Sequence, residues 1–148
     1  MRRPAVALAL LAVATAGVLP AQAAKAKPKP VTGSYPLTLY PDPTPNATDA
    51  DCGVLPMSID KHPFTVPAAG KLEIDLVSKD ATPSASPVHN DWDLYVLDSA
   101  GNTLDSAFTE FATEHTSTKF KKRTPVVIRV CNITGQTTGK VSFRFTYS

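Results

Sequence analysis

Two acidic side chains bracket the only tryptophan of the chain, in the segment Asp91-Trp92-Asp93. Residues two positions apart on a strand project to the same face, so both carboxylates would point the same way. Ca²⁺ prefers roughly six to eight oxygen ligands, and this pair could begin such a site with Asp98 as a third carboxylate. Further oxygens could come from backbone carbonyls or from Asn90 and Glu110.

A structural role explains the same acids equally simply. Asp91 and Asp93 could accept hydrogen bonds from backbone N–H groups of neighbouring loops and hold the entry of a strand in place. The D-x-D spacing lacks the twelve-residue pattern of an EF-hand loop. Two close anions favour a counter-charge, which either Ca²⁺ or a lysine would supply. The calcium site and the structural role therefore remain alternatives.

Catalytic patterns are missing from the sequence. Glycoside hydrolysis needs two acids on opposite sides of a cleft, and neighbours on one strand face are poorly placed for it. There is no G-x-S-x-G or H-E-x-x-H motif. His62, His89 and His115 are scattered, although His89 stands close enough to Asp91 to raise a metal cluster as a minor alternative. We expect no enzymatic activity.

Aromatic and basic residues suggest binding. If Leu94 and Val96 point into a core, Trp92 does too, and Tyr95 points the other way. Tyr95 would then be either a stacking platform for a sugar or a ring covered by a loop. The cluster Lys119-Phe120-Lys121-Lys122-Arg123 could contact anionic wall polymers or phospholipid headgroups. Such a run is also typical of a solvated edge strand.

The elements that must position these residues follow an export signal. Residues 1–23 have a basic start, an apolar run and a small-x-small end at Ala21-Gln22-Ala23, as in a secretory signal peptide. Residues 24–33, rich in Lys, Pro and Ala, predict a flexible linker. Residues 34–148 then form one domain, expected outside a bacterial cell. No later segment is apolar enough to span a membrane.

The charge of the chain argues against nucleic-acid binding. The formal net charge is +2, but the signal and the linker contain much of the basic excess. From residue 31 onward, ten lysines and arginines stand against thirteen acids, a net charge of −3. We therefore expect no nucleic-acid partner.

The two cysteines, Cys52 and Cys131, lie in the part expected to be exported, where an isolated pair is typically bridged. They lack the CxxC spacing and the nearby histidines of a metal site. The sequence predicts a disulfide bond that closes a loop of about 80 residues and adds on the order of 4 kcal/mol of stability.

Alternating apolar residues predict an all-β fold. The clearest alternations, 72–76 and 141–147, each predict a half-buried strand. Residues 92–97 and 125–130 are nearly continuous apolar runs, typical of central strands. Shorter strands are expected at 35–40, 64–66, 103–107 and 117–121. No window shows sustained helical spacing, and the best helix candidate is the short segment 108–115. Turn signals at 67–71, 98–102 and 134–140 separate them. The pattern predicts an antiparallel, jelly-roll-like β-sandwich of seven to eight strands.

Three segments resemble a known family: "HPFTVPAAGKLEIDLV", "DWDLYVLDSAGN" and "PVVIRVCNITGQTTGKVSFRFTY". They are similar to the bacterial pre-peptidase C-terminal domain, with its F-x-V-x-A-G-x-L turn and strand and its D-x-D-L-Y-x-x-D-x-x-G-N motif. The first element has one extra residue before Gly70, and Val126–Val130 lacks the leading tyrosine of the third. The resemblance, which covers residues 59–147, implies a β-sandwich that is often appended to secreted peptidases. Some relatives bind calcium in this region.

Together these observations predict a secreted, non-catalytic module that resembles a free-standing pre-peptidase C-terminal domain and binds or stabilises something outside the cell. Its partner would be an extracellular protein or a glycan. One alternative is a carbohydrate-binding module that uses Tyr95. Another is a protease inhibitor whose reactive segment is the Pro/Ser-rich stretch Asp80–His89.

Overall fold

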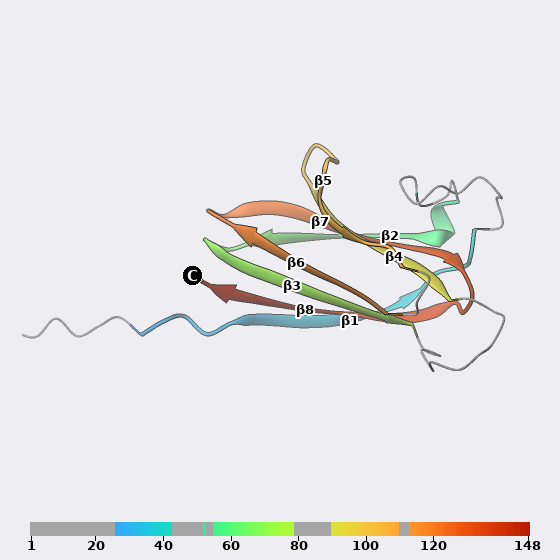
Figure 1. Ribbon diagram of the computed structural model, residues 1–148, viewed down its shortest axis with the longest axis horizontal. Coiled ribbons are helices and arrows are strands. Elements are labelled where there is room, and N and C mark those ends of the chain that lie inside the picture. Colours follow the sequence, from blue (N-terminus) through green and yellow to red (C-terminus); the bar gives the residue numbers. More distant parts are fainter. Residues whose placement is uncertain (1–25, 43–51, 53–54, 79–89, 110–112) are drawn as a thin grey trace, which may run out of the picture.

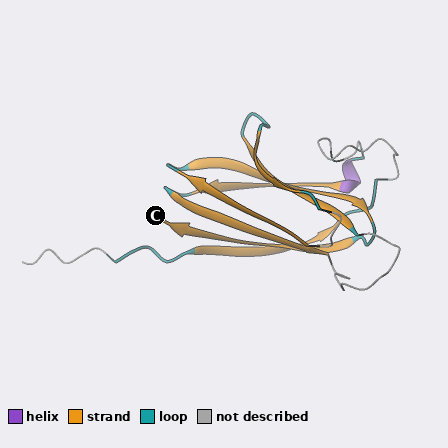
Figure 2. Cartoon of the chain, in the orientation of Figure 1, coloured by secondary structure: helices purple, strands orange, loops and turns teal. Residues whose placement is uncertain are grey.

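The structure, a computed structural model, describes residues 26–42, 52, 55–78, 90–109 and 113–148. These residues form two four-stranded antiparallel sheets that face each other as a sandwich (Figure 1). Figure 2 shows that strands dominate the described chain, with a short 3-10 helix, η1 (Pro56–Ser58), before the second strand. The predicted all-β sandwich is confirmed.

The first sheet contains, in spatial order, β1 (Val31–Thr38), β8 (Thr138–Tyr147), β3 (Gly70–Ser78) and β6 (Thr113–Phe120). The second sheet contains β2 (Ile59–Val66), β7 (Thr124–Thr134), β4 (Asp91–Asp98) and β5 (Thr103–Ala107). The first strand pairs with the last, the second with the seventh, the third with the sixth and the fourth with the fifth. This nested pairing is that of a jelly roll.

The core lies between the sheets and is built from alternate side chains of both. Leu72, Ile74 and Leu76 of β3 are fully buried, while Asp75 between them is exposed. Burying one such aliphatic side chain contributes roughly 1.5–3 kcal/mol. The buried members of the core cluster are Leu37, Leu39, Val66, Leu72, Ile74, Leu76, Trp92, Leu94, Val96, Phe120, Val126, Ile128, Val130, Val141 and Phe145.

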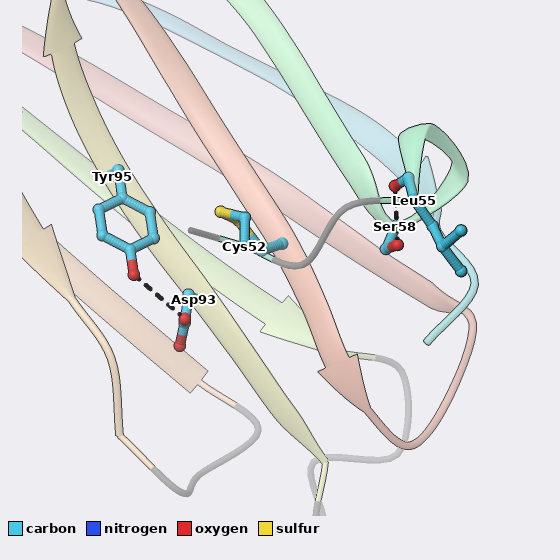
Figure 3. The surroundings of a disulfide bond; sticks show 6 residues. Cys52, Leu55, Ser58, Asp93 and Tyr95 are labelled. Atoms are coloured by element: carbon cyan, nitrogen blue, oxygen red, sulfur yellow. Dashed lines mark hydrogen bonds between the residues drawn. A yellow bond between two sulfur atoms is a disulfide. The ribbon is translucent and has the colours of Figure 1, made fainter. Parts of the chain in front are cut away.

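Strand β4 is buried on both faces, as its apolar run predicts. Trp92, Leu94 and Val96 enter the main core, whereas Tyr95 and Leu97 belong to a second, smaller cluster on the other face of the second sheet. This cluster also contains the cystine Cys52–Cys131. Figure 3 shows its Cys52 side chain together with Tyr95.

The predicted disulfide is confirmed. Cys52 and Cys131 are bonded across 79 positions of sequence, with their Cα atoms 5.2 Å apart. Both residues have no exposed surface. The bond ties the segment between β1 and β2 to the outer face of β7.

Polar side chains close the two open edges of the sandwich. At one edge the Asp105 carboxylate of β5 accepts hydrogen bonds from the Ser117 N–H (3.1 Å) and the Thr118 hydroxyl (2.8 Å) of β6. At the other edge the Tyr35 ring of β1 stacks on His62 of β2, with ring centroids 4.2 Å apart. Burial raises the pKa of the Tyr35 hydroxyl, and the neighbouring Asp60 carboxylate raises it further. Each contact joins one sheet to the other.

The described structure differs from two local expectations. The helix candidate at 108–115 is not helical where the chain is described, because β6 begins at Thr113 and pairs along β3. Strand β1 begins at Val31, so the domain starts three residues before the predicted boundary. In both places pairing with a distant strand decides the conformation, and local composition does not report that pairing.

The glycines of the three predicted turns have different roles. Gly101 and Gly135 have the positive φ angles, 88° and 102°, that favour glycine. Gly70 is instead required by close packing, because a Cβ atom there would lie 2.3 Å from the Thr146 carbonyl oxygen.

Candidate functional site

The predicted calcium ligands are distributed along the whole of β4. Asp91 begins this strand and Asp98 ends it, so their Cα atoms are on the order of 23 Å apart at the usual rise per residue. Asp98 therefore cannot share a cation with Asp91, so a calcium site that begins with Asp91 and Asp93 would need its further oxygens from other groups. This separation could have been predicted from the sequence, because the two acids are seven positions apart on one predicted strand.

Asp98 instead organises the β4–β5 turn. Its Oδ1 accepts the backbone N–H groups of Ala100 and Asn102, both at 2.8 Å, and its Oδ2 accepts the Asn102 side-chain N–H at 2.9 Å. These bonds hold the pKa of the Asp98 carboxyl below its ordinary value, with the side chain of Asn102 as the largest cause. The carboxylate is thus engaged in the turn of the central hairpin.

Asp93 is a buried acid beside an aromatic ring. Only 1% of its surface is exposed, and its Oδ2 accepts a hydrogen bond from the Tyr95 hydroxyl at 3.2 Å (Figure 3). Both side chains lie on the outer face of the second sheet, in register with β7. A buried carboxylate is costly unless it is hydrogen-bonded, so this contact has a structural role.

Asp91 lies near a different acid, Glu114 of β6. The pairing between β4 and β7 shifts between Asp91 and Trp92. Burial raises the pKa of the Glu114 carboxyl, hydrogen bonds from the Thr109 hydroxyl and N–H oppose that shift, and the Asp91 charge adds to it. Asp91 is thus near Glu114, whereas Asp93 contacts Tyr95.

Within the described ranges, no three side chains of His, Cys, Asp or Glu gather closely enough to hold a metal ion. Asp93 and Asp98 both accept hydrogen bonds, although the donors differ from those of the structural alternative: Asp93 accepts the Tyr95 hydroxyl, and Asp98 accepts backbone N–H groups of its own turn. Calcium binding stays a prediction of the D-x-D pattern, to be tested in solution.

Tyr95 is covered, so it does not form an open stacking platform. Its exposed fraction is 4%, and the guanidinium carbon of Arg129 lies 4.4 Å from the centroid of its ring. Of the two alternatives for this ring, the structure supports the covered one and not the sugar platform. Trp92 is fully buried in the main core, as predicted.

The basic run occupies an edge, as one interpretation of it predicts. Lys119 is exposed on β6, which ends the first sheet, and Lys121, Lys122 and Arg123 lie in the exposed turn that follows. The scattered histidines have local partners where they are described. His115 contacts Asp75 at 2.8 Å, and His62 stacks on Tyr35.

A groove of about 530 Å³ runs along the outer face of the first sheet, where β3 begins and where β6 and β8 end. In Figure 1 these three strand ends lie together, close to the C-terminus. The residues that project there alternate with the buried core residues of the same strands. The charged side chains of its lining are Lys71, Glu73, Lys119, Lys121 and Arg144, and Thr146 and Ser148 add hydroxyl groups.

Strand pairing brings the basic residues of the groove together. Lys71 lies directly opposite Lys119 on β6 and Thr146 on β8, while Glu73 lies opposite Arg144. Lys71 forms an ion pair with Glu73. This contact first, and the Arg144 charge among others, hold the pKa of the Glu73 carboxyl below its ordinary value.

Sequence reasoning identified only part of this groove. It singled out the run that contains Lys119 and Lys121, but not Lys71, Glu73 or Arg144. The available signal was the polar half of the two clearest alternating strands, where these three residues stand between core positions. The sequence does not reveal which strands are neighbours in the sheet, and this decides whether the charged side chains lie close together.

Several predictions fall outside the described residues: the signal peptide at 1–23, the reactive stretch Asp80–His89, and Glu110 as a further calcium ligand. Among the residues that are described, there is no helix with the length and hydrophobicity needed to cross a bilayer. No protein-family model matches the chain, and no curated protein matches it.

Proposed function

We propose that this protein is an exported, non-catalytic binding module whose binding surface is the outer face of the first sheet. The observation that carries the proposal is the groove formed there by the ends of β3, β6 and β8. Three paired strands hold most of its lining residues, so the backbone positions of these residues are set before a ligand arrives. A preorganised open groove suits recognition of an extended ligand.

The rest of the described site supports binding over catalysis. Asp98 is engaged in a turn, Asp93 is hydrogen-bonded to Tyr95, and Glu114 is hydrogen-bonded to Thr109. These three acids therefore each have a structural partner. The confirmed cystine suits an extracellular module, and the resemblance to the pre-peptidase C-terminal domain adds to this proposal.

The proposal is tested by blocking the groove. The chain from residue 24, with its disulfide intact, is screened against neutral and charged extracellular polysaccharides and against secreted peptidases. A Thr146→Trp variant places a large ring in the groove, because Thr146 is one of its lining residues and lies opposite Lys71. The matched control is Thr65→Trp, at an exposed position on the second sheet. We expect saturable binding that is lost in Thr146→Trp and kept in Thr65→Trp.

Unchanged melting temperatures establish that both variants fold. Equal binding by both variants would place the binding surface elsewhere and refute the proposal. Turnover of ester, glycoside or peptide substrates by the purified chain would contradict its non-catalytic part.

Calcium binding is tested separately by thermal melting. A rise in melting temperature with millimolar Ca²⁺, lost in Asp93→Asn, would support the prediction from the D-x-D pattern. No shift in the unsubstituted protein would remove it.

A further inference from the structure

The charges of the domain are unevenly distributed. From residue 31 onward there are ten basic and thirteen acidic side chains, and the groove contains four of the basic ones and one of the acidic ones. The remainder therefore has six basic side chains against twelve acidic ones. Counted by side chains, the groove has a net charge of +3 and the rest of the domain has −6, so the groove attracts anions locally.

The arrangement is unfavourable for the empty fold. Lys71 and Lys119 are direct cross-strand partners, and like charges in that position destabilise a sheet. Glu73 offsets one of them through its ion pair with Lys71. An anionic ligand that lies across these strands would offset the remaining positive charges. Arg144, one step along the groove, offers the planar donor geometry that matches a carboxylate or a sulfate.

We infer that the groove binds an acidic polysaccharide, a chain that carries carboxylate or sulfate groups among free hydroxyls. This inference rests on the proposed binding function and names its ligand class. Lys71, Lys119, Lys121 and Arg144 hold the anionic groups. Glu73 and Thr146 serve the hydroxyl groups, which an ionised carboxylate and a side-chain hydroxyl can bind as acceptors.

The same residues argue against other polyanions. Binding of single-stranded nucleic acid uses exposed aromatic rings as stacking platforms. The two rings at this groove are otherwise engaged, since Phe120 is 9% exposed and Tyr147 packs edge-on against Phe145. Single-stranded DNA and anionic vesicles are therefore competing outcomes of the test below.

The test uses two double variants of equal net charge. Lys119→Gln/Lys121→Gln removes two charges from the groove. Lys61→Gln/Lys140→Gln removes two from exposed positions elsewhere, on β2 and at the far end of β8. Alginate, oligogalacturonate and heparin oligosaccharides are titrated calorimetrically into the disulfide-bonded chain at low and high salt, beside neutral oligosaccharides.

We expect saturable binding of an acidic oligosaccharide that weakens with salt. The groove variant should bind about tenfold more weakly and the control within about twofold of the unsubstituted protein. Equal losses in both variants would mean that only net charge matters and would overturn the inference. So would binding of single-stranded DNA or anionic vesicles in place of acidic sugars.

The two proposals fail in distinguishable ways. Suppose that a neutral glycan or a protein binds, and that this binding is lost in Thr146→Trp but unchanged in Lys119→Gln/Lys121→Gln. That result would overturn the acidic ligand and leave the proposed binding function standing. Binding of every probe unaffected by Thr146→Trp would overturn both.

Discussion

Three aspartates of one strand illustrate how environment decides the role of a side chain. Asp98 is half-buried and accepts three hydrogen bonds within its own turn. Asp93, five residues earlier, is buried beside Tyr95, and Asp91 lies near Glu114. The same functional group therefore organises a turn, supports a buried hydroxyl, or opposes another carboxylate. Residue type and spacing alone do not separate these roles.

The turn bonds of Asp98 predict a pH-dependent contribution to stability. Because the folded-state pKa of its carboxyl is lowered, the contribution is present above the unfolded-state pKa and is lost as pH falls through the folded value. The difference in urea midpoint between the unsubstituted protein and Asp98→Ala should be present at pH 6. It should shrink from about pH 4 downward. A difference that is constant with pH would contradict this role.

The Tyr95 hydroxyl should contribute to stability and not to sugar binding. Tyr95→Phe removes the donor to buried Asp93 and should lower the free energy of unfolding by about 1–2 kcal/mol in urea titrations. Tyr40→Phe, at a ring that is 55% exposed, is the control and should change stability by less than about 0.5 kcal/mol. Unchanged stability in Tyr95→Phe would remove the structural role of this bond.

At the scale of elements, the sandwich depends on contacts between strands of different sheets. Asp105 connects β5 to β6, and the Tyr35–His62 stack connects β1 to β2. Edge strands expose unpaired backbone groups, and the Asp105 carboxylate occupies one of these donors on β6. Sequence analysis located 103–107 as a strand with the bounds observed for β5. It had no means of identifying the partner of Asp105, twelve residues away on another sheet.

Removing this carboxylate should loosen the edge. In Asp105→Ala the Ser117 N–H loses its acceptor, so its hydrogen exchange should become faster while amides of the β3–β8 pair keep their rates. Thr103→Ala, at an exposed position of the same strand, should leave the Ser117 amide unchanged. Unaltered exchange at Ser117 in Asp105→Ala would show that the edge does not depend on this contact.

At the scale of the whole molecule, the chain folds back on itself around the β4–β5 turn. Each strand before that turn pairs with one after it, so most contacts join distant parts of the sequence. The cystine acts at the same scale, because it ties the segment after β1 to β7 and closes a loop within the nested chain. A disulfide of this kind restricts the unfolded state more than it changes the folded one.

Loss of the cystine should therefore lower global stability without changing the sheets. The Cys52→Ala/Cys131→Ala variant should lose on the order of 4 kcal/mol in free energy of unfolding, with the far-ultraviolet circular dichroism of the native protein retained. The unsubstituted protein under reducing conditions provides the comparison. A loss confined to a few tenths of a kcal/mol would mean that the bond does not restrict the unfolded chain as proposed.

The sequence by itself determined the all-β class, the core faces of β3 and β8, the central positions of β4 and β7, and the cystine. The strands follow from a two-residue period, which is a local pattern. The cystine follows from the presence of only two cysteines, which leaves one possible pairing. Only the tertiary structure decided that Tyr95 is covered, that Asp91 and Asp98 are far apart, and that Lys71, Lys119 and Arg144 line one groove. These depend on which distant strands become neighbours, and long-range pairing leaves no mark in the spacing of residues along the chain.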